Sequence, residues 1–376
     1  MKFDLYDTSM ADPSRLQGGT SHLGWELETA QHGKSAGVQI LSLNCGGKTI
    51  QILPTRGMGI WRAFHNGKSF LWNSPIDGPV HPMWVPIAEP SGLGWLDGFD
   101  EMMVRCGLAS NGAPEFDSSG NLIWPLHGRI ANLPASQLEI EIDESNGQIV
   151  AKAHVNEFRF HIQKLQLQTE IRLSLTDDYI KVTDRVVNLS QRPAQFQLLY
   201  HCNFGNPMLG PGSKLYAPIR KLVPRNHHSA SAVSTWDAFL PPDSKFEEQV
   251  FFTELAADQN NETLAVLTSN DQASAVSVAY QTESLPCFTI WKNTVSEADG
   301  YVTGLEPATN FPNPRSFEVS HGRMVSLQCG ESKKFELCIG MHVSPDSIAA
   351  AVQKVNDIKV VDPEVHNQPD DLWCSN

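Results

Sequence analysis

Alternating apolar and polar residues recur along this chain from about residue 36 to about residue 340 and limit its fold more than any other feature. Clear runs occur at residues 138–142 and 171–175. A period of two places the apolar side chains on one face of a β-strand. Tight turns separate the runs, and the Asn66-Gly67 pair between apolar segments is typical of a β-hairpin. The chain is therefore expected to form antiparallel sheets, each with one buried face.

Signals for helices are few. Ser344 can cap a helix and Pro345 suits its first position, ahead of the apolar residues Ile348, Ala351, Val352 and Val355. Residues 357–376 have the composition of a polar tail, in which Leu372 and Trp373 are expected to dock on the body.

No segment has the composition of a linker, so we expect one domain over residues 1–376 with its core at about residues 35–345. The predicted fold class is all-β, a large antiparallel two-sheet β-sandwich with few short helices. The 376 residues are enough to bury such a core without disulfides or metal.

The charge balance restricts the partners. Lys and Arg total 28 against 42 Asp and Glu, a formal net charge of −14. Such a chain repels phosphate backbones and anionic lipids, which disfavours nucleic acid and membrane partners. The pattern leaves the oligomeric state open.

The seven cysteines are scattered and contain no Cys-x-x-Cys pair, which predicts neither a disulfide framework nor a structural zinc site. The N-terminal residues 1–7 include two aspartates and do not resemble a signal peptide. No apolar stretch approaches the length that spans a bilayer. We therefore expect a cytoplasmic location.

Two long stretches rich in Trp and Pro, residues 73–136 and 203–249, interrupt the strands and are expected to carry function. Titratable side chains stand beside Gly or Pro in four segments, at Arg56, at His127 with Arg129, at His201 with Asn203, and at Glu306. His201 and Asn203 alternate on a strand and so share a face. Histidine titrates near neutral pH and is a common general acid or base.

Each candidate also has a purely structural interpretation. Arg56, followed by Gly57 and Gly59, could anchor a substrate or form a surface turn, and His127 could line a pocket or bond to backbone. Glu306, between Gly304 and Pro307 at a strand end, could be a solvated charge. Asp237 beside a Trp could frame a sugar or anchor a loop. Lys292 beside a Trp could place a cation in a pocket or solvate one face.

Several enzyme classes are excluded, because the chain has no nucleophile elbow, no phosphate-binding glycine loop and no metal-ligand set. We expect neither a cofactor nor a metal.

Taken in order, these segments resemble the aldose 1-epimerase, or galactose mutarotase-like, superfamily over roughly residues 35 to 345. The resemblance rests on Leu126-His127-Gly128, on Tyr200-His201-Cys202-Asn203-Phe204, and on Leu305-Glu306-Pro307 with the Pro- and Asn-rich segment that follows. It implies the two-sheet supersandwich of that superfamily. The Arg that follows Gly128, and Pro307 after Glu306, depart from the well-studied galactose mutarotases and indicate a poorly characterised branch.

The resemblance implies acid–base chemistry on a sugar hemiacetal. Glu306 would act as the base at the anomeric hydroxyl and His201 as the acid at the ring oxygen, and the roles would reverse when the ring recloses. The residues implied to contact the sugar are Arg56, His127, Arg129, Asn203, Asp237 and Lys292.

The partner expected from this resemblance is a small-molecule sugar. Two other functions are compatible with the same scaffold. One is a carbohydrate-binding protein without turnover. The other is an isomerase or lyase that acts on a larger or modified sugar, for which residues 73–136 could build the pocket.

Overall fold

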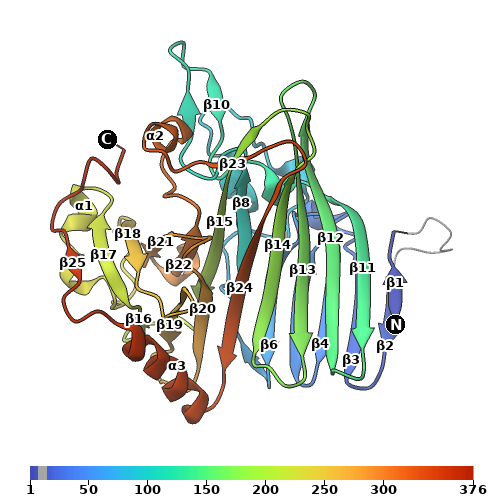
Figure 1. The fold of residues 1–376 in the computed structure, drawn as a ribbon. Coiled ribbons are helices and arrows are strands. Elements are labelled where there is room, and N and C mark those ends of the chain that lie inside the picture. The colour runs from blue at the N-terminus through green and yellow to red at the C-terminus, as the bar shows by residue number, and fades with distance from the viewer. Residues whose placement is uncertain (7–14, 376) are drawn as a thin grey trace.

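The computed structural model of the chain describes residues 1–6 and 15–375 and consists mainly of β-strands in two large sheets (Figure 1). The nine-stranded sheet has the order β1 (Lys2–Asp4), β11 (Ala135–Asp143), β12 (Gln148–Arg159), β13 (Gln163–Ser174), β14 (Tyr179–Asn188), β24 (Ser332–His342), β20 (Ala275–Gln281), β19 (Glu262–Thr268) and β16 (Lys214–Tyr216). All its neighbouring strands are antiparallel.

The second sheet has fourteen strands. Its order is β2 (Arg15–Gly19), β3 (Leu23–Thr29), β4 (Gln39–Cys45), β5 (Lys48–Leu53), β6 (Gly59–His65), β8 (Met103–Leu108), β15 (Ala194–Gly205), β22 (Val302–Ala308), β21 (Cys287–Asn293), β18 (Gln249–Leu255), β17 (Ile219–Pro224) and β25 (Glu364–Val365), with β7 (Lys68–Ser69) beside β6 and β23 (Val325–Leu327) beside β15. A separate hairpin pairs β9 (Glu115–Phe116) with β10 (Leu122–Trp124). The predicted all-β sandwich is confirmed.

Helices are short, apart from one. The described residues form α1 (His227–Ala230), α2 (Arg315–Ser320) and α3 (Pro345–Ile358), and the 3-10 turns η1 (Gly33–Ser35), η2 (Pro82–Trp84), η3 (Gly94–Gly98), η4 (Ile130–Asn132), η5 (Val233–Thr235) and η6 (Glu297–Asp299). Helix α3 begins as predicted, because the Ser344 side chain accepts a hydrogen bond from the Ser347 amide. No helix in the described part of the chain is long and apolar enough to cross a membrane.

The core lies between the two sheets and is formed by the apolar residues at alternate positions of the strands. Leu41 and Ile50 from the larger sheet join Ile149 and Ile171 from the smaller one in a single buried cluster. The polar residues between them face away, as an antiparallel sandwich requires.

One buried ion pair connects the sheets through this core. Arg105 of β8 donates from Nε and Nη2 to the carboxylate of Asp184 on β14, at 2.5 and 3.0 Å. The Tyr200 hydroxyl donates to the same carboxylate at 2.9 Å, and Thr169 accepts from Arg105 at 2.8 Å. The side chains of Arg105 and Asp184 are fully buried. The pair sets the position of β8 and β15 relative to the opposite sheet.

We predict that Asp184→Ala lowers the free energy of unfolding by about 3–5 kcal/mol, because it leaves a buried guanidinium without its partner. The matched control is Asp177→Ala, which breaks the partly exposed pair with Arg172 at 3.2 Å and should cost about 0–1 kcal/mol. Urea unfolding of both variants gives the comparison. Equal, small losses would contradict the role assigned to Asp184.

Candidate functional site

Strand β15 places two polar side chains on the outer face of the larger sheet. Tyr200, Cys202 and Phe204 belong to the core cluster between the sheets. His201 and Asn203 alternate with them and therefore point the other way. The sequence prediction that His201 and Asn203 share one face is consistent with this strand.

The strand ladder brings Glu306 next to His201. Cys202 of β15 lies opposite Leu305 of β22, and this register sets His201 opposite Glu306. Glu306 therefore lies inside β22, whereas the sequence suggested a strand end. His201 Nε2 and Glu306 Oε1 are 3.2 Å apart. The carboxyl oxygen makes no aligned hydrogen bond, and Glu306 is only 2% exposed.

Asn203 fixes the tautomer of His201. Its Nδ2 donates to the carbonyl oxygens of Glu101, at 2.9 Å, and of His201, at 3.2 Å. The amide oxygen is therefore turned toward His201 Nδ1, 2.6 Å away, and can only accept a hydrogen bond from it. Nδ1 carries a proton, so Nε2, the atom that faces Glu306, is the one that exchanges protons.

Burial controls the charge of this pair. It raises the pKa of Glu306 well above its usual range, and the nearby carboxylate of Glu248 acts in the same direction. Burial also lowers the pKa of His201, and the neighbouring His127 adds to this effect. Burial therefore disfavours charge on both groups and favours the neutral form of the pair, in which the exchangeable proton lies on the Glu306 carboxyl.

The pair requires glycine at position 304. Gly304 lies opposite Asn203 in the ladder. A Cβ placed there would come within 2.5 Å of Glu306 Oε1 and 3.0 Å of His201 Cε1. Any side chain at this position would push the imidazole of His201 and the carboxyl of Glu306 apart.

Aromatic rings cover His201. Trp95 comes from η3, and Phe99 follows that turn; their ring centroids lie 6.1 and 5.2 Å from that of His201. Trp291 of β21 lies 5.5 Å away at a steep angle. Trp95 and Phe99 are buried, so the pair lies beneath the loop between β7 and β8.

His127 joins the same site from the loop after β10. Its ring centroid lies 5.4 Å from that of His201 and 4.6 Å from that of Trp95. His127 Nδ1 donates to the carbonyl of Asn111 at 2.9 Å, which leaves Nε2 free to interact with a ligand. Burial lowers the pKa of His127 to about 4, so its imidazole is neutral.

An amide pair links the His127 loop to the segment after Glu306. Asn111 and Asn310 exchange side-chain hydrogen bonds at 3.0 and 2.9 Å, and both are fully buried. The carbonyl of Asn111 is the group that holds His127. The spacing between His127 and Glu306 is therefore fixed by hydrogen bonds as well as by the sheet.

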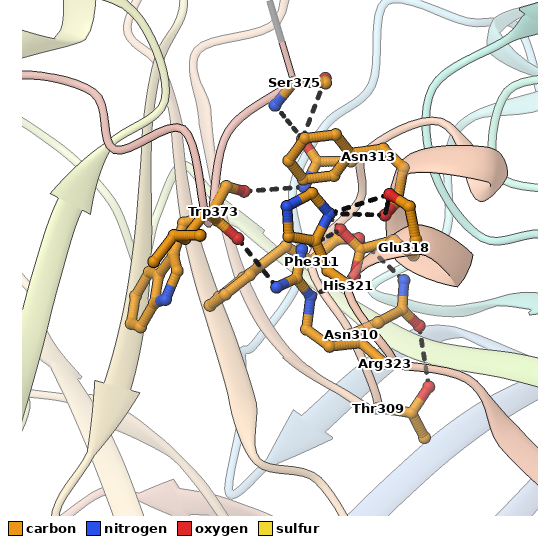
Figure 2. A network of polar contacts seen from close by, with 12 residues as sticks. Thr309, Asn310, Phe311, Asn313, Glu318, His321, Arg323, Trp373 and Ser375 are labelled. Atoms are coloured by element: carbon orange, nitrogen blue, oxygen red, sulfur yellow. Dashed lines mark hydrogen bonds and ion pairs between the residues drawn. The ribbon is translucent and has the colours of Figure 1, made fainter.

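The chain terminus closes over this segment (Figure 2). Asn313 donates to the carbonyl of Trp373 at 2.8 Å and accepts from the Ser375 amide at 3.1 Å. Asn313 also donates to Glu318 at 2.7 Å. The Trp373 ring lies 4.6 Å from that of Phe311. Trp373 docks on the body as predicted, whereas Leu372 remains exposed.

Two charged residues form one rim of the site. Trp291 Nε1 donates to Glu248 at 2.8 Å, and Arg225 lies 3.3 Å from the same side chain. The charges of Arg225 and Glu248 have opposite effects on the pKa of His127 and of Glu306. The cation and the anion neutralise each other there.

Arg56 was expected to contact substrate, but the structure contradicts this. The guanidinium is buried and donates to Glu101 Oε1 at 2.8 Å, to the Val80 carbonyl at 2.8 Å and to the Gly98 carbonyl at 2.6 Å. These bonds occupy Nε, Nη1 and Nη2. Arg56 instead stabilises, through these hydrogen bonds, the loop that carries Trp95 and Phe99.

Lys292 and Asp237 were also expected at the site, and the structure places both on the other side of the sheet. Lys292 alternates with Trp291 and packs against Phe239 of the core, 5.2 Å from Nζ to the ring. Its ammonium donates to the carbonyls of Thr235 and Ala238. Asp237 pairs with Lys214 of the smaller sheet at 3.4 Å.

Arg129 follows His127 closely in sequence but has an exposed side chain. It lines a small surface cavity of about 80 Å³ together with Trp124 and the buried Glu157. His201 and Glu306 do not line that cavity. The structure therefore separates Arg129 from His201. It places His127, Asn203 and Glu306 around His201.

The sequence did not single out Trp95, Glu248 or Arg225 as site residues. Trp95 lies in the stretch 73–136, and Arg225 and Glu248 lie in the stretch 203–249, both of which were expected to carry function, and this is the local signal for all three residues. In the described part of the chain no cluster of His, Cys, Asp and Glu side chains could hold a metal ion.

Comparison with known proteins places the fold. The profile of a family described as a domain of unknown function, DUF4432, matches residues 35–341. A candidate aldose 1-epimerase from Klebsiella pneumoniae subsp. pneumoniae is similar over 98% of this chain and 98% of its own, with 32% identity and a TM-score of 0.93. No functionally curated protein matches the sequence.

More distant structures share the fold alone. A galactose mutarotase-like protein from Clostridium acetobutylicum covers 86% of this chain and 100% of its own at 16% identity, with a TM-score of 0.60. Galactose 1-epimerase from Lactobacillus acidophilus covers 85% and 99% at 14% identity, with a TM-score of 0.56. The expected mutarotase-like sandwich is confirmed.

We predict that Glu306→Gln stabilises the protein and that the gain grows between pH 5 and pH 8. The pKa of Glu306 is raised in the folded state, so as pH rises above about 4.3 the unfolded chain ionises freely while the folded chain must retain the proton. A glutamine at position 306 does not ionise, so the variant's stability does not fall with rising pH for this reason. Urea unfolding at both pH values measures the difference.

The matched control is Glu318→Gln, because Glu318 is equally buried but is paired with Arg323 at 2.6 Å. This variant should lose stability at both pH values. A Glu306→Gln variant that is less stable than the wild type at pH 8 would contradict the burial argument.

We also predict that His201 is neutral and protonated on Nδ1 at pH 7. The lowered pKa keeps the imidazolium unpopulated there, and Asn203 selects the tautomer. Nitrogen-15 NMR of labelled histidine separates the two tautomers and the cation. An Nε2-protonated neutral ring would refute the role of Asn203.

Proposed function

Because this chain belongs to the DUF4432 family within the galactose mutarotase-like superfamily, we propose that it is an isomerase of the aldose 1-epimerase type. The reaction would interconvert the anomers of a sugar through the open-chain aldehyde. The observation that carries the proposal is the 3.2 Å approach of His201 Nε2 to Glu306 Oε1 in a buried site.

Anomer exchange requires two proton transfers at one hemiacetal. In the form of the pair in which the proton lies on His201, Glu306 takes the proton of the anomeric hydroxyl and His201 gives its proton to the ring oxygen. The ring C–O bond breaks and the aldehyde forms. The pair is then neutral, with the proton on Glu306, and ring closure after rotation reverses both transfers.

This cycle conserves protons within the pair. One exchangeable proton is present before and after ring opening, first on His201 and then on Glu306. Burial, which stabilises the neutral form of the pair, favours the state that follows ring opening. No proton from solvent is needed during the cycle.

The charges around the site support an uncharged sugar as substrate. Arg56 and Lys292 are bonded elsewhere, and Arg225 is paired with Glu248 at 3.3 Å. A phosphate or carboxylate on the sugar would need an unpaired cation in this position. We therefore propose a neutral aldose.

A sugar-binding protein without turnover is the second candidate. The aromatic rings of Trp95 and Trp291 beside the site favour it, because aromatic faces stack on the apolar faces of sugar rings. The presence of both an acid and a base makes catalysis the better supported of the two functions.

We predict that Glu306→Gln and His201→Asn each lower the mutarotation rate by about 100- to 10,000-fold, equivalent to roughly 2.7–5.5 kcal/mol of activation free energy. Neither amide can exchange the proton, while the shape of the site is retained. Polarimetry on pure anomers of common aldoses measures the rate above the spontaneous one.

The control is Asp237→Asn, which changes a carboxylate that lies on the other side of the sheet and should keep the rate within about twofold. Full activity of Glu306→Gln would remove Glu306 from the mechanism. Wild-type protein that binds a sugar without accelerating mutarotation would favour the second candidate.

A further inference from the structure

Three buried polar atoms around the reactive pair have no hydrogen-bond partner. They are Glu306 Oε1, Trp95 Nε1 and Thr289 Oγ1. The exposed fractions of the three residues are 2%, 2% and 1%. Buried polar atoms of folded proteins almost always have a partner, so a group of three around one site needs an explanation.

Thr289 is the cross-strand neighbour of Glu306. The ladder between β21 and β22 pairs the two residues directly, so their side chains share the outer face of the sheet. His201 lies on the other flank of Glu306, on β15. One row across three strands therefore carries an imidazole, a carboxyl and a hydroxyl.

Trp95 lies above this row. Its ring contacts His127 at 4.6 Å and Phe99 at 4.6 Å between centroids, and lies 6.1 Å from His201. The indole N–H can only donate. Trp72, in the same apolar cluster, donates its own N–H to the Glu101 carbonyl, whereas the N–H of Trp95 has no partner.

From these contacts we propose that Trp95 and Thr289 bind the substrate directly, Trp95 by donating to a sugar oxygen and Thr289 by bonding to a sugar hydroxyl. The inference rests on the proposed function. A polyhydroxylated ring matches the set, because each hydroxyl both donates and accepts. The indole N–H of Trp95 needs an acceptor, and Glu306 accepts the proton of the anomeric hydroxyl. The hydroxyl of Thr289 can donate a hydrogen bond to a neighbouring sugar hydroxyl or accept one from it.

The contacts determine specificity rather than proton transfer. Neither the indole of Trp95 nor the hydroxyl of Thr289 titrates in the pH range in which His201 and Glu306 exchange their proton. Loss of either should weaken binding of the sugar and leave the chemical step nearly unchanged.

The test uses the full-length protein and pure α-anomers of D-glucose, D-galactose and D-xylose. Thr289→Val removes the hydroxyl and keeps the shape, and Thr289→Ser restores the hydroxyl. Trp95→Phe removes the N–H. Each lost hydrogen bond should raise KM about 2- to 12-fold, with kcat within about twofold, and Thr289→Ser should recover most of the wild-type KM.

Two matched controls separate binding from packing. Trp25 Nε1 on β3 is also buried and unpartnered, but that strand is separated from β15 by four others, so Trp25→Phe should leave KM unchanged. Thr253 on β18 donates to the Phe288 carbonyl at 2.8 Å. Thr253→Val should lower stability and leave KM unchanged.

Each outcome decides the matter. An active wild type whose KM is unaffected by Thr289→Val or by Trp95→Phe overturns the assignment of that residue alone. Failure of Thr289→Ser to restore KM shows that shape, not the hydroxyl, is responsible. If the wild type binds a sugar without turnover, calorimetric Kd values for the same variants replace KM. Wild-type protein that neither converts nor binds these sugars overturns both the inference and the proposed function.

Discussion

The backbone ladder between β15 and β22 is the constraint on which the site depends. It sets His201 opposite Glu306, and the alternation of each strand sends Tyr200 and Leu305 into the core while His201 and Glu306 face outward. A shift of one residue in either strand would turn that strand's site residue into the core between the sheets and move its core residues to the outer face. The ion pair between Arg105 and Asp184 adds a second restraint, because it holds the neighbouring strand against the opposite sheet. The site therefore forms together with the fold, because the same strand pairing produces both.

Burial of the reactive pair has opposite consequences for stability and for chemistry. It disfavours charge on both groups, which raises the pKa of Glu306 and lowers that of His201. The protein must fold around a carboxyl whose Oε1 makes no aligned hydrogen bond, and this costs stability. The same dry setting strengthens every electrostatic contact with a bound ligand. Asn203, Gly304 and the Asn111–Asn310 amide pair keep the groups in place despite that cost.

Arg56 and Lys292 illustrate where local reasoning fails. An arginine followed by glycines suggests an accessible side chain, but acceptors from residues 80, 98 and 101 bind the donors of Arg56, and those contacts arise only when the loop folds back. Trp291 and Lys292 are adjacent on one strand, so only one of them can face the site. The alternation predicts that they face opposite ways but not which one faces the site, since that depends on the partner sheet. Thr289 gave no local signal at all, because its position beside Glu306 is a property of the ladder.

The sequence by itself determined the strands, most turns, the cap of α3 and the shared face of His201 and Asn203, because period-two alternation, Asn-Gly pairs and capping residues act over a few residues. Its resemblance to a known superfamily also indicated His127, His201 and Glu306. Only the tertiary structure decided which cations reach the site, which polar atoms lack partners and that burial disfavours charge on His201 and Glu306. The physical reason is that desolvation and strand register are set by residues far away in the chain, so no local pattern records them.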